Sequence, residues 1–107
     1  MDKEDLSRSI KNILQEKNIS FSKIMLFGSR ALENNTEDSD WDILILVENG
    51  LSTRERMDLS IELSRAFHNE FPLEPVDIIV KTTQQFEDEK SVMNTISSEA
   101  FLEGINL

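Results

Sequence analysis

The sequence predicts a small α/β (α+β) domain in which a mixed sheet of about three strands is flanked by helices. Long segments with apolar residues at helical spacing alternate with short runs of β-branched and aliphatic residues. One helical segment lies between two of these runs, and such a strand–helix–strand connection almost always joins parallel strands by a right-handed crossover. At 107 residues, the chain has room for one core, and we expect a single domain over residues 1–107.

The first expected helix spans residues 2 to about 17. Its apolar side chains recur on one face at 3.6 residues per turn, namely Leu6, Ile10, Ile13 and Leu14. Asp2 can cap the first turn, with Asp5 reinforcing it, and Asn18 can end the helix. Residues 23–27 then predict a short buried strand, which Gly28 ends.

The next segment predicts a connection and the strongest strand. A single turn is expected at residues 30–32, and a polar loop at 33–39, in which Asp38 is expected to be a turn residue. Residues 41–47 are mostly β-branched and aliphatic and predict a strand. The two strands on either side of this loop can be antiparallel.

The second long helix is expected over residues 52–69, with Ser52 and Glu55 at capping-box spacing. Its apolar stripe consists of Leu59, Leu63, Ala66 and Phe67. Residues 75–80 predict a third strand, because proline is tolerated at the first position of a strand.

The tail predicts two helical pieces. Residues 83–90 form a short polar one, and residues 91–103 a second with Val92, Ile96 and Ala100 on one face. Gly104 is expected to end it. The resulting element order is α-β-β-α-β-α.

Composition limits the function. The net charge is −10 with only 11 Lys and Arg residues, which opposes direct nucleic-acid binding and fits a basic protein partner. An acidic surface that only aids solubility explains the charge equally well. The chain has no cysteine for a disulfide or a thiolate zinc site. Its longest apolar run, 43–47, is too short to cross a bilayer, and no signal-peptide core follows the acidic start, so we expect a cytoplasmic protein without membrane contact.

Three carboxylates are expected at one edge of the sheet. Gly28 and Ser29 leave the first strand, while Asp40 and Asp42 enter the second, so antiparallel pairing places these motifs together. Asp77 enters the third strand, which reaches the same edge if it is parallel to the second. Asp40 and Asp42 share a face because strand side chains alternate.

Such a cluster requires protonation or a cation. Two like charges about 4 Å apart cost roughly 1 kcal/mol in water and roughly 4 kcal/mol at an effective dielectric near 20. Oxygen-only ligands favour Mg²⁺ or Mn²⁺, and two such ions suit nucleotidyl transfer. The alternative is that these aspartates are turn and cap residues. The spacing fits neither an EF-hand nor a P-loop, and His68 is interpreted as structural or solvated.

The residues around Gly28-Ser29, followed by ten residues (30–39) and Asp40-Trp41-Asp42, resemble the signature of the DNA-polymerase-beta-like nucleotidyltransferases. The Val76–Ile79 run is similar to that family's third-carboxylate strand, and the resemblance covers about residues 23–81. The short chain and the acidic segment at 86–90 resemble the minimal (MNT) branch. The resemblance implies the palm-like nucleotidyltransferase fold.

The resemblance also implies roles for individual residues. Gly28, Ser29 and Arg30 would bind the triphosphate, and Asp40, Asp42 and Asp77 would be catalytic and hold two Mg²⁺ ions. Many relatives continue with an Arg-Gly pair where this chain has Leu32-Glu33, so a second arginine contact is lost.

By resemblance, the expected activity is transfer of AMP from ATP to a hydroxyl. The acceptor would be a tyrosine of a helical HEPN-type toxin that the chain controls as antitoxin, with the toxin or a homodimer supplying the missing wall of the site. Two alternatives stay open: a non-catalytic antitoxin that neutralises its partner by contact, and transfer to a small molecule such as an antibiotic. Intact Asp40, Asp42 and Asp77 favour catalysis.

Overall fold

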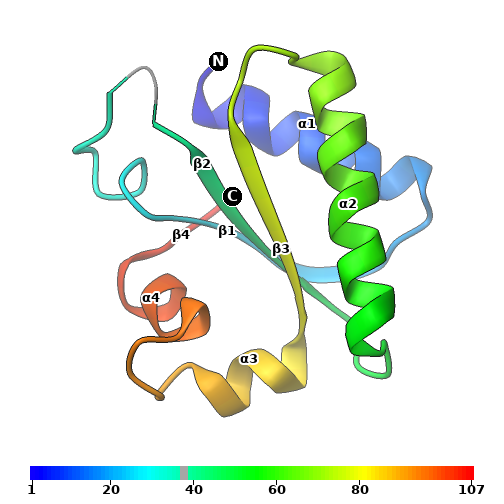
Figure 1. Ribbon diagram of the computed structural model, residues 1–107, viewed down its shortest axis with the longest axis vertical. Helices are drawn as coiled ribbons and strands as arrows, with labels where there is room; N and C mark the ends of the chain where they lie inside the picture. The colour runs from blue at the N-terminus through cyan, green and yellow to red at the C-terminus, as the bar shows by residue number, and fades with distance from the viewer. Residues whose placement is uncertain (37–38) are drawn as a thin grey trace.

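The sheet has four strands in the order β3-β2-β1-β4 (Figure 1). The computed structural model describes residues 1–36 and 39–107. The strands are β1 (Phe21–Phe27), β2 (Trp41–Val47), β3 (Val76–Thr82) and β4 (Ile105–Asn106). β1 and β2 are antiparallel, and β2 and β3 are parallel, as the sequence predicts.

Helices cover both faces of the sheet (Figure 1). The four helices are α1 (Lys3–Glu16), α2 (Thr53–Glu70), α3 (Thr83–Glu89) and α4 (Ile96–Glu103). α1 and α2 pack with one face of the strands, and α3 and α4 with the other. None of the helices within the described residues is long and apolar enough to cross a membrane.

β2 is the centre of both core layers. Its alternate side chains Trp41, Ile43 and Ile45 join the α1–α2 layer, while Leu44 and Leu46 join the α3–α4 layer. A strand buried on both faces reads as a continuous apolar run, and this explains why residues 43–47 carry no polar side chain. The layers therefore hold β2 in one register, because a one-residue slip would exchange its faces.

The helix caps follow the expected chemistry. Asp2 accepts a hydrogen bond from the Asp5 backbone at 2.8 Å, in a capping box that starts α1. Ser52 and Glu55 form the second capping box, at the start of α2. Asn18 ends the first helical segment with a positive φ of 56°. These caps confirm the predicted helix starts.

The C-terminal part differs from the prediction. Residues 91–95 form turns instead of the first part of a helix, so α4 begins only at Ile96. The Thr95 hydroxyl donates to the Val92 carbonyl at 2.9 Å and accepts from the Ser98 backbone, which makes Thr95 the helix cap. Val92 was expected on the buried face, but it is 52% exposed. A positive φ of 65° at Asn94 interrupts the helix.

The strands also extend beyond their predicted bounds. β1 begins two residues earlier than expected, and β3 continues to Thr82. β4 was not predicted, because its two residues carry no periodic signal; it pairs antiparallel with Met25 and Leu26. The predicted turn residue Asp38 lies outside the described residues.

Truncation of the α2 core residue should destabilise the fold. Phe67 is fully buried against α1 and the sheet. Phe67→Ala leaves a cavity and should lower the free energy of unfolding by about 3–5 kcal/mol in urea titrations. Leu73→Ala is the control, since Leu73 is 95% exposed, and its effect should stay within about 0.5 kcal/mol. Equal effects of the two substitutions would contradict this assignment of the core.

Candidate active site

A tight turn follows β1 at Gly28. Gly28 has a φ of +75°, and its carbonyl accepts hydrogen bonds from the Ala31 and Leu32 backbones at 3.1 and 3.3 Å. This is the single turn predicted after the first strand. Ser29 is half-buried in the turn, and its carbonyl accepts from the Asn34 backbone at 3.2 Å. The turn thus places two small residues at the end of β1.

Asp42 lies between this turn and Asp77. In the sheet register, Asp42 is opposite Phe27 on β1 and beside Asp77 on β3. Registered residues of neighbouring strands point to the same face, so the two carboxylates lie side by side. Asp40 precedes β2 by one residue. The three aspartates and Gly28 therefore share one edge of the sheet, as the predicted topology required.

The Asp42 carboxylate contacts the backbone of Gly28. A Cβ atom built on Gly28 would lie 2.3 Å from Asp42 Oδ2, a separation that real Cβ atoms essentially never show. Any side chain at position 28 would therefore displace the carboxylate. Glycine at this position allows the positive φ and also leaves the space that Asp42 occupies.

Neighbouring charges act on Asp42. Burial raises the pKa of Asp42, and the negative charges of Asp77, Asp40 and Glu99 raise it further, in that order. Asp42 is half-buried, whereas Asp40 and Asp77 are exposed. All of these influences favour the protonated form of Asp42, so a bound proton or cation would stabilise the site.

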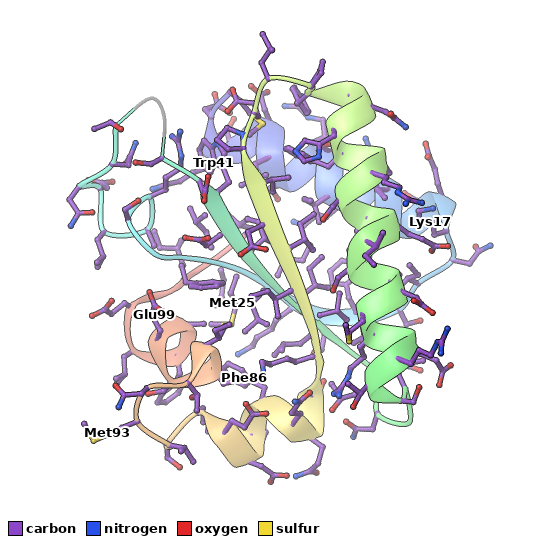
Figure 2. All side chains as sticks on the ribbon, in the orientation of Figure 1. Lys17, Met25, Trp41, Phe86, Met93 and Glu99 are labelled. Carbon is purple, nitrogen blue, oxygen red and sulfur yellow. The ribbon has the colours of Figure 1, made fainter. Side chains whose placement is uncertain are left out.

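Glu99 is the site residue that sequence reasoning missed. It lies in the first turn of α4, a helix that packs beside β1 (Figure 2). It lies 57 residues from Asp42 along the chain, and although the predicted helix over residues 91–103 includes it, no sequence pattern reports how that helix packs on the sheet. Only the packing of α4 on the sheet brings its charge within range of Asp42.

The carboxylates suit a metal that is also held by a substrate. Among residues 1–36 and 39–107, no three His, Cys, Asp or Glu side chains form a group that could hold a metal ion by themselves. Mg²⁺ rarely uses such an all-protein cage; one or two carboxylates with substrate phosphates and waters are its usual ligands. The adjacent oxygen ligands of Asp42 and Asp77 fit that pattern.

Arg30 contacts the loop and Trp41. Its guanidinium lies 4.0 Å from the centre of the Trp41 ring, and its Nε donates to the Ser39 carbonyl at 2.9 Å. The Trp41 ring, labelled in Figure 2, packs in the α1–α2 layer. Because strand side chains alternate, Asp42 lies on the opposite face of β2. These contacts fix the start of β2; a contact of Arg30 with phosphate stays a prediction.

The sequence profile of the family described as "Polymerase beta, Nucleotidyltransferase" matches residues 8–94 of the chain. The match includes the Gly28 turn and all three aspartates. No curated protein sequence matches the chain significantly.

Solved structures share the fold. A candidate minimal nucleotidyltransferase is 24% identical, with 100% of this chain and 97% of that chain covered and a TM-score of 0.59. A toxin–antitoxin structure with AMP-PNP is 21% identical, and the match covers 92% of this chain and 69% of that chain, with a TM-score of 0.59. A mutant of the toxin–antitoxin MntA-HpeT is 23% identical, with 94% and 70% covered and the same TM-score of 0.59.

Removal of the Asp42 charge should stabilise the chain at neutral pH. The pKa of Asp42 is raised in the folded state, so the folded chain binds this proton more tightly than the unfolded chain. Stability is therefore lost as pH rises from the ordinary aspartate pKa through the raised one. Asp42→Asn cannot ionise, and it should be more stable than the wild type above this window.

Urea unfolding at a series of pH values checks this expectation. The difference between Asp42→Asn and the wild type should shrink as the pH falls below the ordinary aspartate pKa, because both side chains are then neutral. Asp58→Asn removes one negative charge at an exposed position of α2 and is the matched control for the change in net charge. A wild type that is more stable than Asp42→Asn at neutral pH would contradict the charge repulsion.

Proposed function

The chain belongs to the polymerase beta nucleotidyltransferase family, and from this premise we propose that it transfers AMP from ATP to a hydroxyl group of a partner protein. The observation that carries the proposal is the contact of the Asp42 carboxylate with the Gly28 turn, next to Asp77. It supports the proposal because carboxylate oxygens that could hold a metal ion lie beside the Gly-Ser turn that would bind the triphosphate.

In this proposal, the turn after β1 would bind the triphosphate and the aspartates at the strand ends would bind the metal ions. Gly28 leaves the space that the Asp42 carboxylate occupies, and its turn would bind the triphosphate, with the Ser29 hydroxyl donating a hydrogen bond to the β- or γ-phosphate. Asp40, Asp42 and Asp77 would hold two Mg²⁺ ions together with phosphate oxygens. When bound, these ions neutralise the phosphate charge and the mutual repulsion that raises the pKa of Asp42.

The proposed reaction is an in-line displacement. The acceptor hydroxyl oxygen forms a bond to the α-phosphorus of ATP, and the bond from that phosphorus to the bridging oxygen breaks. Pyrophosphate leaves, AMP stays on the acceptor, and Asp77 takes the hydroxyl proton. Asp77 suits this role because it is exposed at the strand edge, where an acceptor can approach.

A protein acceptor, and antitoxin function, have two sources of support. The fold is shared with toxin–antitoxin structures, one of them with the ATP analogue AMP-PNP. The net charge of −10 complements a basic partner. We propose a helical toxin of the HEPN type as this partner and one of its tyrosines as the acceptor.

A non-catalytic antitoxin is the second candidate. It is favoured by the observation that no three carboxylates of the described residues form a metal-binding group on their own. In that case the chain would neutralise its partner by contact alone, and the charge of Asp42 would not matter for neutralisation.

Labelled transfer tests the proposed reaction. The chain is incubated with the toxin partner, Mg²⁺ and ATP labelled at the α-phosphate, and the partner is analysed by intact mass. We expect the partner to gain one or more AMP units. Asp42→Asn should reduce the rate by at least about 10²-fold, since it removes a charged metal ligand. Asp58→Asn is the control and should transfer at the wild-type rate.

The two candidates differ in their outcomes. Loss of both transfer and toxin control in Asp42→Asn supports catalysis. Full toxin control by Asp42→Asn, with no AMP on the partner in either case, would replace the enzymatic proposal with the contact antitoxin.

Gly28 offers a matched test of the site geometry. Gly28→Ala and Gly50→Ala both strain a backbone with positive φ, of +75° and +107°, but only the Cβ at position 28 meets Asp42. Both should lower stability, by about 1 kcal/mol or more. Only Gly28→Ala should weaken ATP–Mg²⁺ binding, by about tenfold or more, in isothermal calorimetry. Equal binding by both variants would show that the Gly28–Asp42 contact is irrelevant to the site.

A further inference from the structure

β3 forms a free edge of the sheet. It is the outermost strand in the order β3-β2-β1-β4 and is seven residues long. A groove of about 390 Å³ runs between this edge and α2, and half of its lining residues are apolar, namely Met57, Ile61, Ile78, Ile79 and Val80. Edges of this length are usually shortened, charged or covered, because their backbone groups can pair with another strand.

The backbone direction of β3 defines which groups are available. The Trp41 N–H donates to the Pro75 carbonyl at 2.9 Å. In a parallel strand, every second residue directs both its N–H and its C=O to the same neighbouring strand. Since the Pro75 carbonyl points to β2, the backbone groups of Asp77, Ile79 and Lys81 point to β2 as well. Val76, Ile78 and the following even-numbered residues of β3 therefore direct their backbone groups outward.

We propose that a second copy of the chain pairs its β3 with this edge, antiparallel about a two-fold axis at Ile79. This register pairs all seven residues of β3. It places Ile78 opposite Val80 of the second copy, so outward-facing backbone groups meet one another. Registers centred one residue earlier or later keep this parity but leave residues at one strand end unpaired.

Charge selects the same register. Asp77 falls opposite Lys81 of the second copy, and the symmetry repeats the pair on the other side of the axis. Lys81 forms an ion pair with Glu89 of α3, with 3.0 Å between Nζ and Oε2, and only 15% of the Lys81 side chain is exposed. Opposite charges directly across an antiparallel pair stabilise it, and like charges destabilise it.

The apolar lining is self-complementary as well. Met57 and Ile61 lie one turn apart on α2 and are 61% and 50% exposed. A two-fold axis at Ile79 would bring them toward their counterparts on α2 of the second copy, where both would lose contact with water. Arg56 donates a hydrogen bond to Gln85 of α3 within the same groove.

The pairing would also bring positive charge to the aspartates at the strand ends. Each copy would place Lys81 beside Asp77 of the other, where one chain has accumulated negative charge. A role of this pairing in catalysis rests on the proposed function, whereas the formation of the dimer does not.

Sedimentation velocity of the full chain, without nucleotide, tests the proposal over a concentration series. We expect a dimer of twice the 12.3 kDa chain mass at high concentration. Ile61→Lys should give monomers. Met93→Lys is the matched control, because Met93 is 81% exposed but lies outside the groove, and it should leave the dimer intact.

A charge exchange tests the register. Lys81→Asp should raise the dimer dissociation constant by about tenfold, because both symmetric pairs become repulsive. Asp77→Lys combined with Lys81→Asp should restore the dimer, which a folding defect would not do. Monomeric wild type at every concentration, or failure of the double variant to restore dimers, would overturn the proposal. AMP transfer can fail while the dimer persists, so this test is separate from that of the proposed function.

Discussion

The structure depends on how β2 is held at its first residues. From Ile43 onward the strand is buried on both faces, between α1 and α2 on one side and α3 and α4 on the other. Asp42 is the point at which this apolar strand becomes polar, and it cannot move without shifting the strand. Its carboxylate consequently contacts the Gly28 backbone and lies beside Asp77. The stability of the core thus maintains a charge arrangement that is unfavourable by itself.

The opposite face of β2 stabilises the same position. The Trp41 ring packs in the α1–α2 layer, and its Nε1 donates to Glu74 at 3.1 Å. Arg30 covers that ring while its Nε donates to Ser39, so the loop after Gly28 is tied to the start of β2. Residues on one face of the strand therefore fix the orientation of Asp42 on the other. This offers a structural role for the arginine of the Gly-Ser-Arg sequence.

Much of this arrangement could be predicted because its signals are local or topological. The stripes and caps of α1 and α2 are short-range patterns, and the parallel pairing of β2 with β3 follows from the handedness of the crossover. Asp42 and Asp77 could therefore be placed together. The charge of Glu99 acts on Asp42 only through the packing of α4, which no local pattern reports. The turns at 91–95 are not predicted, because Val92 lies at helical spacing from Ile96 and Ala100; the cap at Thr95 ends that pattern in the structure.

The charge balance links the site to the rest of the molecule. Each neighbour that shifts the pKa of Asp42 by its charge is a carboxylate, and Arg30 contacts a ring on the opposite face of the strand. In the proposals above, positive charge would reach these carboxylates from metal ions bound with the nucleotide, from Lys81 of a second copy, or from basic residues of a protein partner. Because each of these would neutralise the same carboxylates, their binding would be coupled. One that lowers the repulsion would change the affinity of another by some factor, and that other would change its affinity by the same factor. A chain of this charge is therefore suited to respond to its partners through the electrostatics of a single strand end.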